Sequence, residues 1–254
     1  MTQSFVWYEL MTPDPQVSRK FYEAVIGWRV DEQPTGEMDY RMIASPEGLT
    51  GGMLTINADM KAGGAKPGWL GYIGVDDVDQ CIADVQAAGG AVHLPAFDLD
   101  GVGRLAMIAD PFGAVFYILR GVGDQPSQAF SPRSLGHGGW NELHASDGAA
   151  ALAFYTKHFG WSESRAMDMG PMGTYYVFET GDGVDTGGIM TDSNFPTPAW
   201  LYYFNTEDID AAKTRVEAAG GAVIFGPMEV PGPMMVLTAT DPHGALFALV
   251  APKT

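Results

Sequence analysis

The stretch Val6-Trp7-Tyr8-Glu9-Leu10 decides the fold, because a near copy of it, Gly139-Trp140-Asn141-Glu142-Leu143, returns 133 residues later. Each copy is a short apolar run that carries one glutamate. Phe-Tyr begins 14 residues after each tryptophan, and a Gly-Trp pair closes each block. A pattern that returns in the same order and spacing is an internal duplication, which predicts two similar units in one chain.

The repeat extends along each half of the chain. The later matches share an offset of 131 residues: Trp69 with Trp200, Asp77 with Asp208, and Asp110-Pro111 with Asp241-Pro242. Between the two copies lies a stretch rich in Gly, Pro and Ser, which is typical of a linker. We therefore predict one domain over residues 1–122, a linker over 123–136 and a second domain over 137–254.

Local signals divide the first domain into two units, each with the order strand, helix and two or three strands. Asp14 followed by Pro15 is typical of a helix start, and Gly27 of a helix end. Gly51-Gly52 indicates a turn or bulge, and residues 58–67 indicate a flexible connection. The predicted strands are 4–12, 38–45, 51–57, 69–75, 91–94, 103–109 and 114–119.

Composition limits the class of protein. The chain has 254 residues, 46% of them hydrophobic and 18% charged, which is typical of a globular protein with a sizeable core. A formal net charge of −17, without clusters of Lys and Arg, argues against nucleic acid as a partner. A single cysteine, Cys81, excludes an intramolecular disulfide. No apolar run is long enough to span a membrane and no signal peptide is seen, so we expect a cytoplasmic protein.

The motifs resemble a known family. Trp-x-Glu-Leu, Phe-Tyr and Gly-Trp, then Val-Asp-Asp-Val-Asp, Ala-Ala-Gly-Gly and Asp-Pro-x-Gly-Ala, together resemble the glyoxalase/bleomycin-resistance/extradiol-dioxygenase superfamily, also called vicinal oxygen chelate proteins. The resemblance covers nearly the whole chain, in two copies. It implies an α+β fold of tandem glyoxalase-like domains. Each domain would have two βαβββ modules that form a curved mixed sheet around a cavity for a small ligand.

The chain departs from this family at the metal site. The superfamily's metal enzymes take one ligand from the first strand, one from the start of the second module and one from the last strand. The motifs place these positions at Trp7, Leu70 and Tyr117 in the first half, and at Trp140, Leu201 and Ala248 in the second. Divalent metals need imidazole, carboxylate or thiolate donors, so we expect neither the usual metal site nor a cofactor. Glyoxalase I and extradiol dioxygenase chemistry, which depend on that metal, are therefore in doubt.

Two glutamates are the candidate catalytic residues. Side chains alternate along a strand, so Glu9 shares a face with Trp7, and Glu142 with Trp140. A carboxylate among aromatic rings is desolvated, which raises its pKa and suits it to proton transfer. A structural role, or pairing with a cationic ligand, is left open by the sequence. The predicted ligand contacts are Trp7, Tyr72, Arg104, Tyr117, Trp140 and Tyr203.

Two further features remain open. Arg104, which has Met235 at its place in the second half, either binds a carboxylate ligand, pairs with Glu9 or is a solvated surface residue. His144 shares a face with Glu142, but the sequence shows no third donor for a metal.

The sequence supports three functions and leaves open whether the chain is an enzyme. The first is a protein that binds a small apolar or aromatic metabolite or drug without the metal triad. The second is a lyase, isomerase or hydrolase that acts on a small oxygenated substrate, with Glu9 or Glu142 as base. The third is a metal-dependent glyoxalase or dioxygenase with a shifted ligand set that includes Glu9, Glu142 or His144. The expected partner is a small molecule, and the chain is expected to be a monomer or homodimer.

Overall fold

The structure is a computed structural model that describes residues 3–34, 38–123, 126–193, 195 and 197–253. Residues 124 and 125 of the predicted linker lie outside the described residues. The first module contains β1 (Phe5–Thr12), α1 (Pro15–Ile26), β2 (Arg29–Val30), β3 (Tyr40–Ser45), β4 (Gly48–Thr55) and α2 (Ala58–Ala62). The second contains β5 (Gly68–Gly74), α3 (Val78–Ala87), β6 (Ala91–Leu99), β7 (Gly103–Ala109) and β8 (Val115–Gly121).

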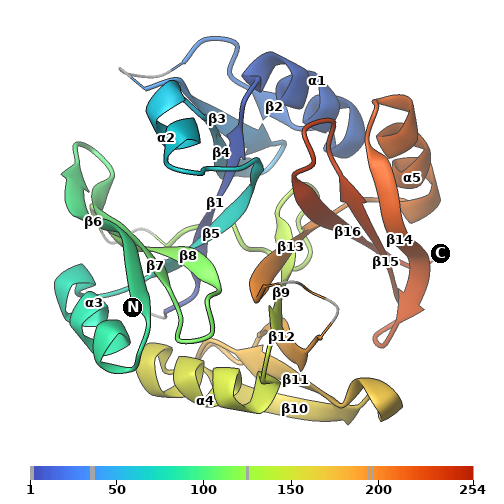
Figure 1. Ribbon diagram of the computed structural model, residues 1–254. Helices are drawn as coiled ribbons and strands as arrows, with labels where there is room; N and C mark the ends of the chain where they lie inside the picture. Colours follow the sequence, from blue (N-terminus) through green and yellow to red (C-terminus); the bar gives the residue numbers. More distant parts are fainter. Residues whose placement is uncertain (1–2, 35–37, 124–125, 194, 196, 254) are drawn as a thin grey trace. The chain divides into compact units, whose positions relative to one another are not determined.

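The second half repeats this order. The third module contains β9 (Gly138–Ala145), α4 (Gly148–Phe159), β10 (Ser162–Asp168), the 3₁₀ turn η1 (Gly170–Met172), β11 (Thr174–Glu179) and β12 (Asp185–Thr191). The fourth contains β13 (Ala199–Asn205), α5 (Ile209–Ala218), β14 (Ala222–Val230), β15 (Met234–Thr240) and β16 (Leu246–Pro252). Two eight-stranded mixed sheets result, in the orders β2-β3-β4-β1-β5-β8-β7-β6 and β10-β11-β12-β9-β13-β16-β15-β14 (Figure 1). The predicted α+β class and the tandem repeat are confirmed.

The helix signals in the sequence were read correctly. The Asp14 carboxylate accepts hydrogen bonds from the N–H groups of Gln16 and Val17, and Gly27 ends α1 with φ 85°. The prediction of a flexible connection over 58–67 was wrong at its start. Asn57 caps α2 there, its Oδ1 accepting from the N–H of Met60 at 2.9 Å. Among the described residues, no helix combines the length and the apolar composition needed to cross a membrane.

Two compact units each combine segments of both halves. One contains Met1–Val6, Gly71–Ser127 and Asn141–Leu201, and therefore joins the second and third modules. The other contains Trp7–Leu70, Gln128–Trp140 and Tyr202–Thr254, and joins the first and fourth modules. The boundaries of 1–122 and 137–254, drawn from the repeat, stay a prediction.

Each module packs its main helix against its own strands. Helix α5 lies along β14, β15 and β16, and α4 lies against β11 and β12 (Figure 1). Aromatic side chains fill the cores beneath the helices. In the unit of the first and fourth modules, Phe21 of α1 contacts Phe247 of β16 at 5.8 Å between ring centroids. In the other unit, Trp161 stacks on Phe178 at 4.4 Å.

A buried chain of hydrogen bonds connects the paired modules in each unit. In one unit, Trp200 Nε1 donates to Tyr155 Oη at 3.2 Å, and the Tyr155 hydroxyl donates to Asp110 Oδ2 at 3.0 Å. In the other, Trp69, Tyr22 and Asp241 make the equivalent contacts at 2.9 and 3.4 Å. The aspartates also shape the turns before β8 and β16, and burial raises the pKa of both.

Candidate functional site

Glu9 is buried on strand β1, and Glu142 lies at the equivalent position on strand β9. Tyr8 and Leu10 on either side of Glu9 are fully buried, and the Glu9 side chain points to the other face of the strand, where the residue is 3% exposed. On that face Glu9 pairs in register with Gly52 of β4, as Glu142 pairs with Gly188 of β12. A glutamate beside a glycine therefore marks the same place in both halves.

The glycines serve close packing, and of the turn or bulge predicted at Gly51-Gly52 the structure has a bulge, because the register of β3 with β4 shifts beside Gly51. Both residues lie inside β4. A Cβ atom on Gly52 would lie 2.0 Å from Tyr40 Oη, and one on Gly188 would lie 2.1 Å from Tyr175 Oη. The rings of Tyr40 and Tyr175 therefore lie directly over Gly52 and Gly188, the glycines that pair with the two glutamates.

The tyrosine hydroxyls connect to the residues singled out in the sequence. Tyr175 donates to Glu142 Oε2 at 2.7 Å. In the first module, the indole N–H of Trp7 donates to Tyr40 Oη at 2.7 Å. Neither tyrosine was predicted as a site residue. The Gly-Gly pair opposite each glutamate could have indicated these tyrosines. Glycine inside a strand often marks a place where another group approaches the backbone closely.

The second half adds an imidazole and a further carboxylate. His144 Nε2 lies 3.0 Å from Glu142 Oε1, and Nδ1 lies 3.0 Å from Asp192 Oδ2. The ring of Phe195 stacks on the imidazole at 4.0 Å. Burial by itself lowers the pKa of His144, but the hydrogen bonds and negative charges of Glu142 and Asp192 outweigh it and raise this pKa above its ordinary value. Sequence reasoning missed Asp192, which is 48 residues from His144 and meets it only through the fold.

Two predicted ligand contacts meet in the second module. Tyr72 and Tyr117 are partners in register on β5 and β8, and their rings stack at 4.3 Å. Met107 of β7 and Leu94 of β6 continue the row. The structure therefore brings this predicted pair of rings together on one face of the sheet.

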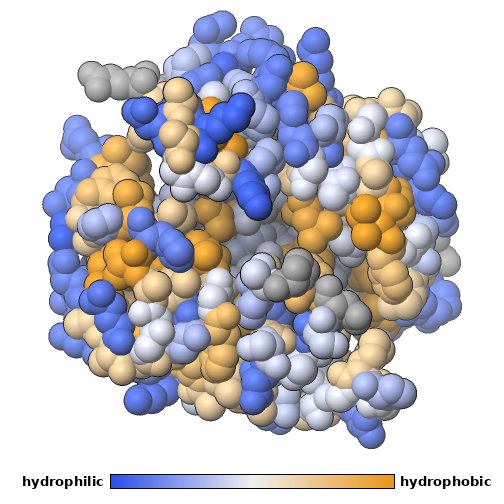
Figure 2. Space-filling model, viewed as in Figure 1, coloured by the Kyte–Doolittle hydropathy of each residue, from blue (hydrophilic) through white to orange (hydrophobic). Residues whose placement is uncertain are grey.

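The corresponding row of the fourth module has a different composition. Tyr203 pairs with Ala248, Ala248 with Thr238, and Thr238 with Phe225. Phe225 is 50% exposed and nearby Met228 is 43% exposed. Figure 2 shows hydrophobic residues gathered over β14 to β16. Partners in register share a face, so Tyr203 and Phe225 are on the same face.

Arg104 is already neutralised within its own module. Its guanidinium makes two 2.8 Å hydrogen bonds to Asp79 of α3 and one of 3.1 Å to Asp98. Its role as a ligand contact stays a prediction, and a ligand carboxylate would have to compete with these two partners.

The residues at the superfamily's metal positions do not fit a divalent ion. Trp7 presents an N–H donor, Tyr117 is stacked on Tyr72, and the other four positions are Trp140, Leu70, Leu201 and Ala248. Among the described residues, no group of three His, Cys, Asp or Glu side chains is arranged to hold a metal. Glu142 and Asp192 lie at different nitrogens of His144, so these three side chains do not converge on one point.

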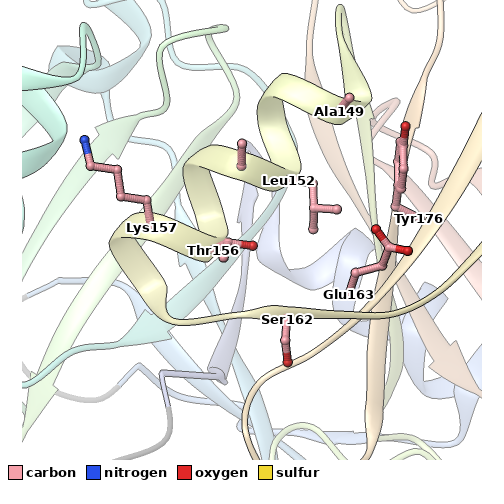
Figure 3. A pocket seen from close by; sticks show the side chains of 8 residues that line it. Ala149, Leu152, Thr156, Lys157, Ser162, Glu163 and Tyr176 are labelled. Carbon is pink, nitrogen blue, oxygen red and sulfur yellow. The ribbon is translucent and has the colours of Figure 1, made fainter.

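A surface hollow is lined by residues other than the predicted site residues. It has a volume of about 570 Å³ and lies between α4 and the strands β10 and β11 (Figure 3). Its lining includes Leu152, Thr156, Lys157, Glu163 and Tyr176. None of these residues was predicted as a site residue.

Comparison with known proteins identifies the class. Residues 4–118 and 139–249 match the Glyoxalase/Bleomycin resistance protein/Dioxygenase superfamily, and the chain belongs to it. It is 34% identical over 252 residues to the "Putative glyoxylase CFP32" of Mycobacterium tuberculosis, covering 97% of this chain and 94% of that protein. It is 31% identical over 262 residues to the "Anthracycline biosynthesis protein DnrV" of Streptomyces peucetius, covering 96% and 91%.

Solved structures agree on the fold. A variant of homoprotocatechuate 2,3-dioxygenase from B. fuscum superposes with a TM-score of 0.70 at 15% identity, covering 100% of this chain and 72% of that one. The Mn(II)-bound glyoxalase from Novosphingobium aromaticivorans gives 0.66 at 15% identity, with 100% and 83% covered. At this level of identity the similarity concerns the fold alone.

Proposed function

We propose that this chain binds a small apolar or aromatic molecule without the metal triad of the superfamily's enzymes. The observation that carries the proposal is the chemistry of the six metal positions, which offer indole, phenol and aliphatic groups where imidazole and carboxylate would be needed. Aromatic rings stack well on other aromatic rings, and five of the six proposed contacts are aromatic: Trp7, Tyr72, Tyr117, Trp140 and Tyr203, with Arg104 as the sixth. The relationship to DnrV, named for anthracycline biosynthesis, is compatible with such a ligand.

An enzyme is the second candidate, favoured by one observation. Glu142 accepts a hydrogen bond from Tyr175 and lies 3.0 Å from Nε2 of His144, whose Nδ1 is hydrogen-bonded to Asp192. Such an arrangement suits a lyase or isomerase that moves a proton on a small oxygenated substrate, with Glu142 or its counterpart Glu9 as base. A metal enzyme with a shifted ligand set would have to rearrange His144, because its two nitrogens face different carboxylates.

The test combines metal analysis with ligand-induced stabilisation. Protein purified without chelator is expected to contain far less than one equivalent of any transition metal. A panel of small aromatic compounds should include members that raise the melting temperature, since a ligand at one hundred times its Kd stabilises by about 2.7 kcal/mol. A stoichiometric transition metal, or a panel without effect on melting, would contradict the proposal. Metal-free turnover that is lost in Glu142→Gln would favour the enzyme instead.

Phe225→Ala tests the face of the fourth module. We expect affinity for aromatic probes to fall roughly two- to tenfold, since an aromatic pair contributes about 0.5–1.5 kcal/mol beyond its buried area. Stability should change little, because Phe225 is half exposed. Val17→Ala on α1, which removes another exposed apolar side chain, is the matched control in a calorimetric titration. Equal affinities of the two variants would remove Phe225 from the site.

A further inference from the structure

The third module differs from the first in the groups around its glutamate. The repeat aligns Glu142 with Glu9 and His144 with Met11. The backbone aligns Asp192 with Ile56, because Asp192 N–H donates to Ala145 O just as Ile56 N–H donates to Thr12 O. At these two positions the second half therefore has ionisable side chains where the first half has apolar ones.

The imidazole of His144 lies between two carboxylates. Glu142 approaches from its own strand β9, and Asp192 from the residue after β12. Tyr175 of β11 reaches the same glutamate through its hydroxyl, and Phe195 covers the imidazole face. Among the described residues, no group of helix α4, which packs on β11 and β12, makes a hydrogen bond or ion pair with this imidazole.

A proton on His144 balances these charges. With the imidazole charged, the trio of Glu142, His144 and Asp192 carries a net charge of −1, and each ring nitrogen lies 3.0 Å from a carboxylate oxygen. Without that proton the charge is −2, and one of the two nitrogens presents a lone pair to a carboxylate. Loss of the proton therefore removes the electrostatic attraction between His144 and Glu142, whose atoms lie 3.0 Å apart.

The contact of Glu142 with Tyr175 indicates which chemical group this carboxylate binds. An ionised carboxylate only accepts hydrogen bonds, and it has about four acceptor sites. Tyr175 shows that a phenol fits, with its hydroxyl 2.7 Å from Oε2. Hydrogen bonds of this charge-assisted kind are roughly twice as strong as neutral ones. The Glu142 side chain is 13% exposed, so it lies at the edge of the buried region.

We propose that Glu142 binds the hydroxyl group of an aromatic ligand, and that His144 and Asp192 are positioning residues that hold Glu142 for it. The second half of the chain is then the half that distinguishes hydroxylated from other aromatic ligands. This inference rests on the proposed function, because it names the chemistry of the same class of ligand.

The test compares 1-naphthol with 1-methoxynaphthalene, which lacks the hydroxyl donor. Calorimetric titration of the wild-type protein at pH 6 should give a Kd for 1-naphthol about tenfold lower than for the methyl ether. Glu142→Gln should reduce this preference strongly. Met11→Leu, a conservative change on the first strand, should leave it intact. Equal Kd values for the two compounds in the wild-type protein would overturn the proposal.

His144→Met and Asp192→Leu test the positioning roles. Each puts an apolar side chain at a position where the first half also has an apolar residue. The wild-type preference for 1-naphthol should weaken between pH 6 and pH 8. It should be small in both variants, and in His144→Met, which has no imidazole, it should also be independent of pH. A variant that keeps the wild-type preference and its pH profile would overturn the positioning role. Thermal melting of each variant confirms that it folds.

A proton-linked stability measurement separates failure of this inference from failure of the proposed function. Because the pKa of His144 is raised in the folded protein, its stabilising effect is complete below its unfolded pKa of about 6.5 and is lost as the pH rises through the folded value. The melting-temperature difference between wild-type protein and His144→Met should therefore shrink from pH 6 to pH 9. If neither naphthalene compound binds, the proposed function fails. A shrinking difference would still support the charged cluster, and a constant difference would overturn it.

Discussion

Asp110→Ala is expected to lower the free energy of unfolding by about 3–5 kcal/mol. Asp110 is 2% exposed, and its Oδ1 accepts from the N–H groups of Phe112 and Ala114 at 2.9 Å. Its Oδ2 accepts from Tyr155 at 3.0 Å. Alanine leaves these three donors without their acceptor, and a buried unsatisfied group costs about 1–3 kcal/mol.

Urea unfolding followed by tryptophan fluorescence measures this loss. The matched control is Asp182→Ala, because Asp182 is exposed and accepts from one backbone N–H, that of Val184 at 3.0 Å. That variant should lose about 1 kcal/mol or less. If Asp110→Ala loses no more than the control, the hydrogen-bond chain through Tyr155 does not connect the second and third modules as described.

Gly187→Ala is the second substitution with a large expected effect. A Cβ at this position would lie 2.0 Å from the backbone oxygen of Asn141 and 2.6 Å from Phe178 Cζ. The backbone cannot give way without separating β9 from β12, which pair in parallel at this point. Overpacking costs about 1–3 kcal/mol and occasionally more, and we expect the upper end of that range.

Differential scanning calorimetry provides the measurement. A loss of about 3 kcal/mol corresponds to a fall of about 6–12 °C in Tm for a chain of this size. Gly68→Ala is the control, because a Cβ there meets no heavy atom within 4 Å. Equal Tm values for the two variants would show that β9 and β12 do not approach as closely as the structure has them.

Local signals in the sequence predicted the helices and the repeat well. Asp14, Pro15 and Gly27 act through hydrogen bonds and dihedral angles of their immediate neighbours, so they can be read without the fold. Gly51-Gly52 left a turn and a bulge open in the sequence, because the same residue type serves more than one purpose, and the structure has the bulge. Glycine permits a turn, and it also permits close approach inside a strand, where Tyr40 lies over Gly52.

The candidate site was predicted only in part. The order of residues along β9 was enough to predict that Glu142 and His144 share a face. Asp192, Tyr175 and Phe195 come from other segments, and only the pairing of β9 with β12 and of β12 with β11 brings them together. The pairing of modules within each compact unit depends on contacts such as Tyr22 with Asp241, which are 219 residues apart.

Equilibrium dialysis of the protein against 1-naphthol, with and without EDTA, distinguishes metal-free binding from metal-dependent binding. We expect saturable binding with the same Kd in both conditions, because the proposed recognition uses aromatic rings and hydrogen bonds and needs no metal. Absence of saturable binding, or binding that EDTA abolishes and a divalent metal restores, would contradict it.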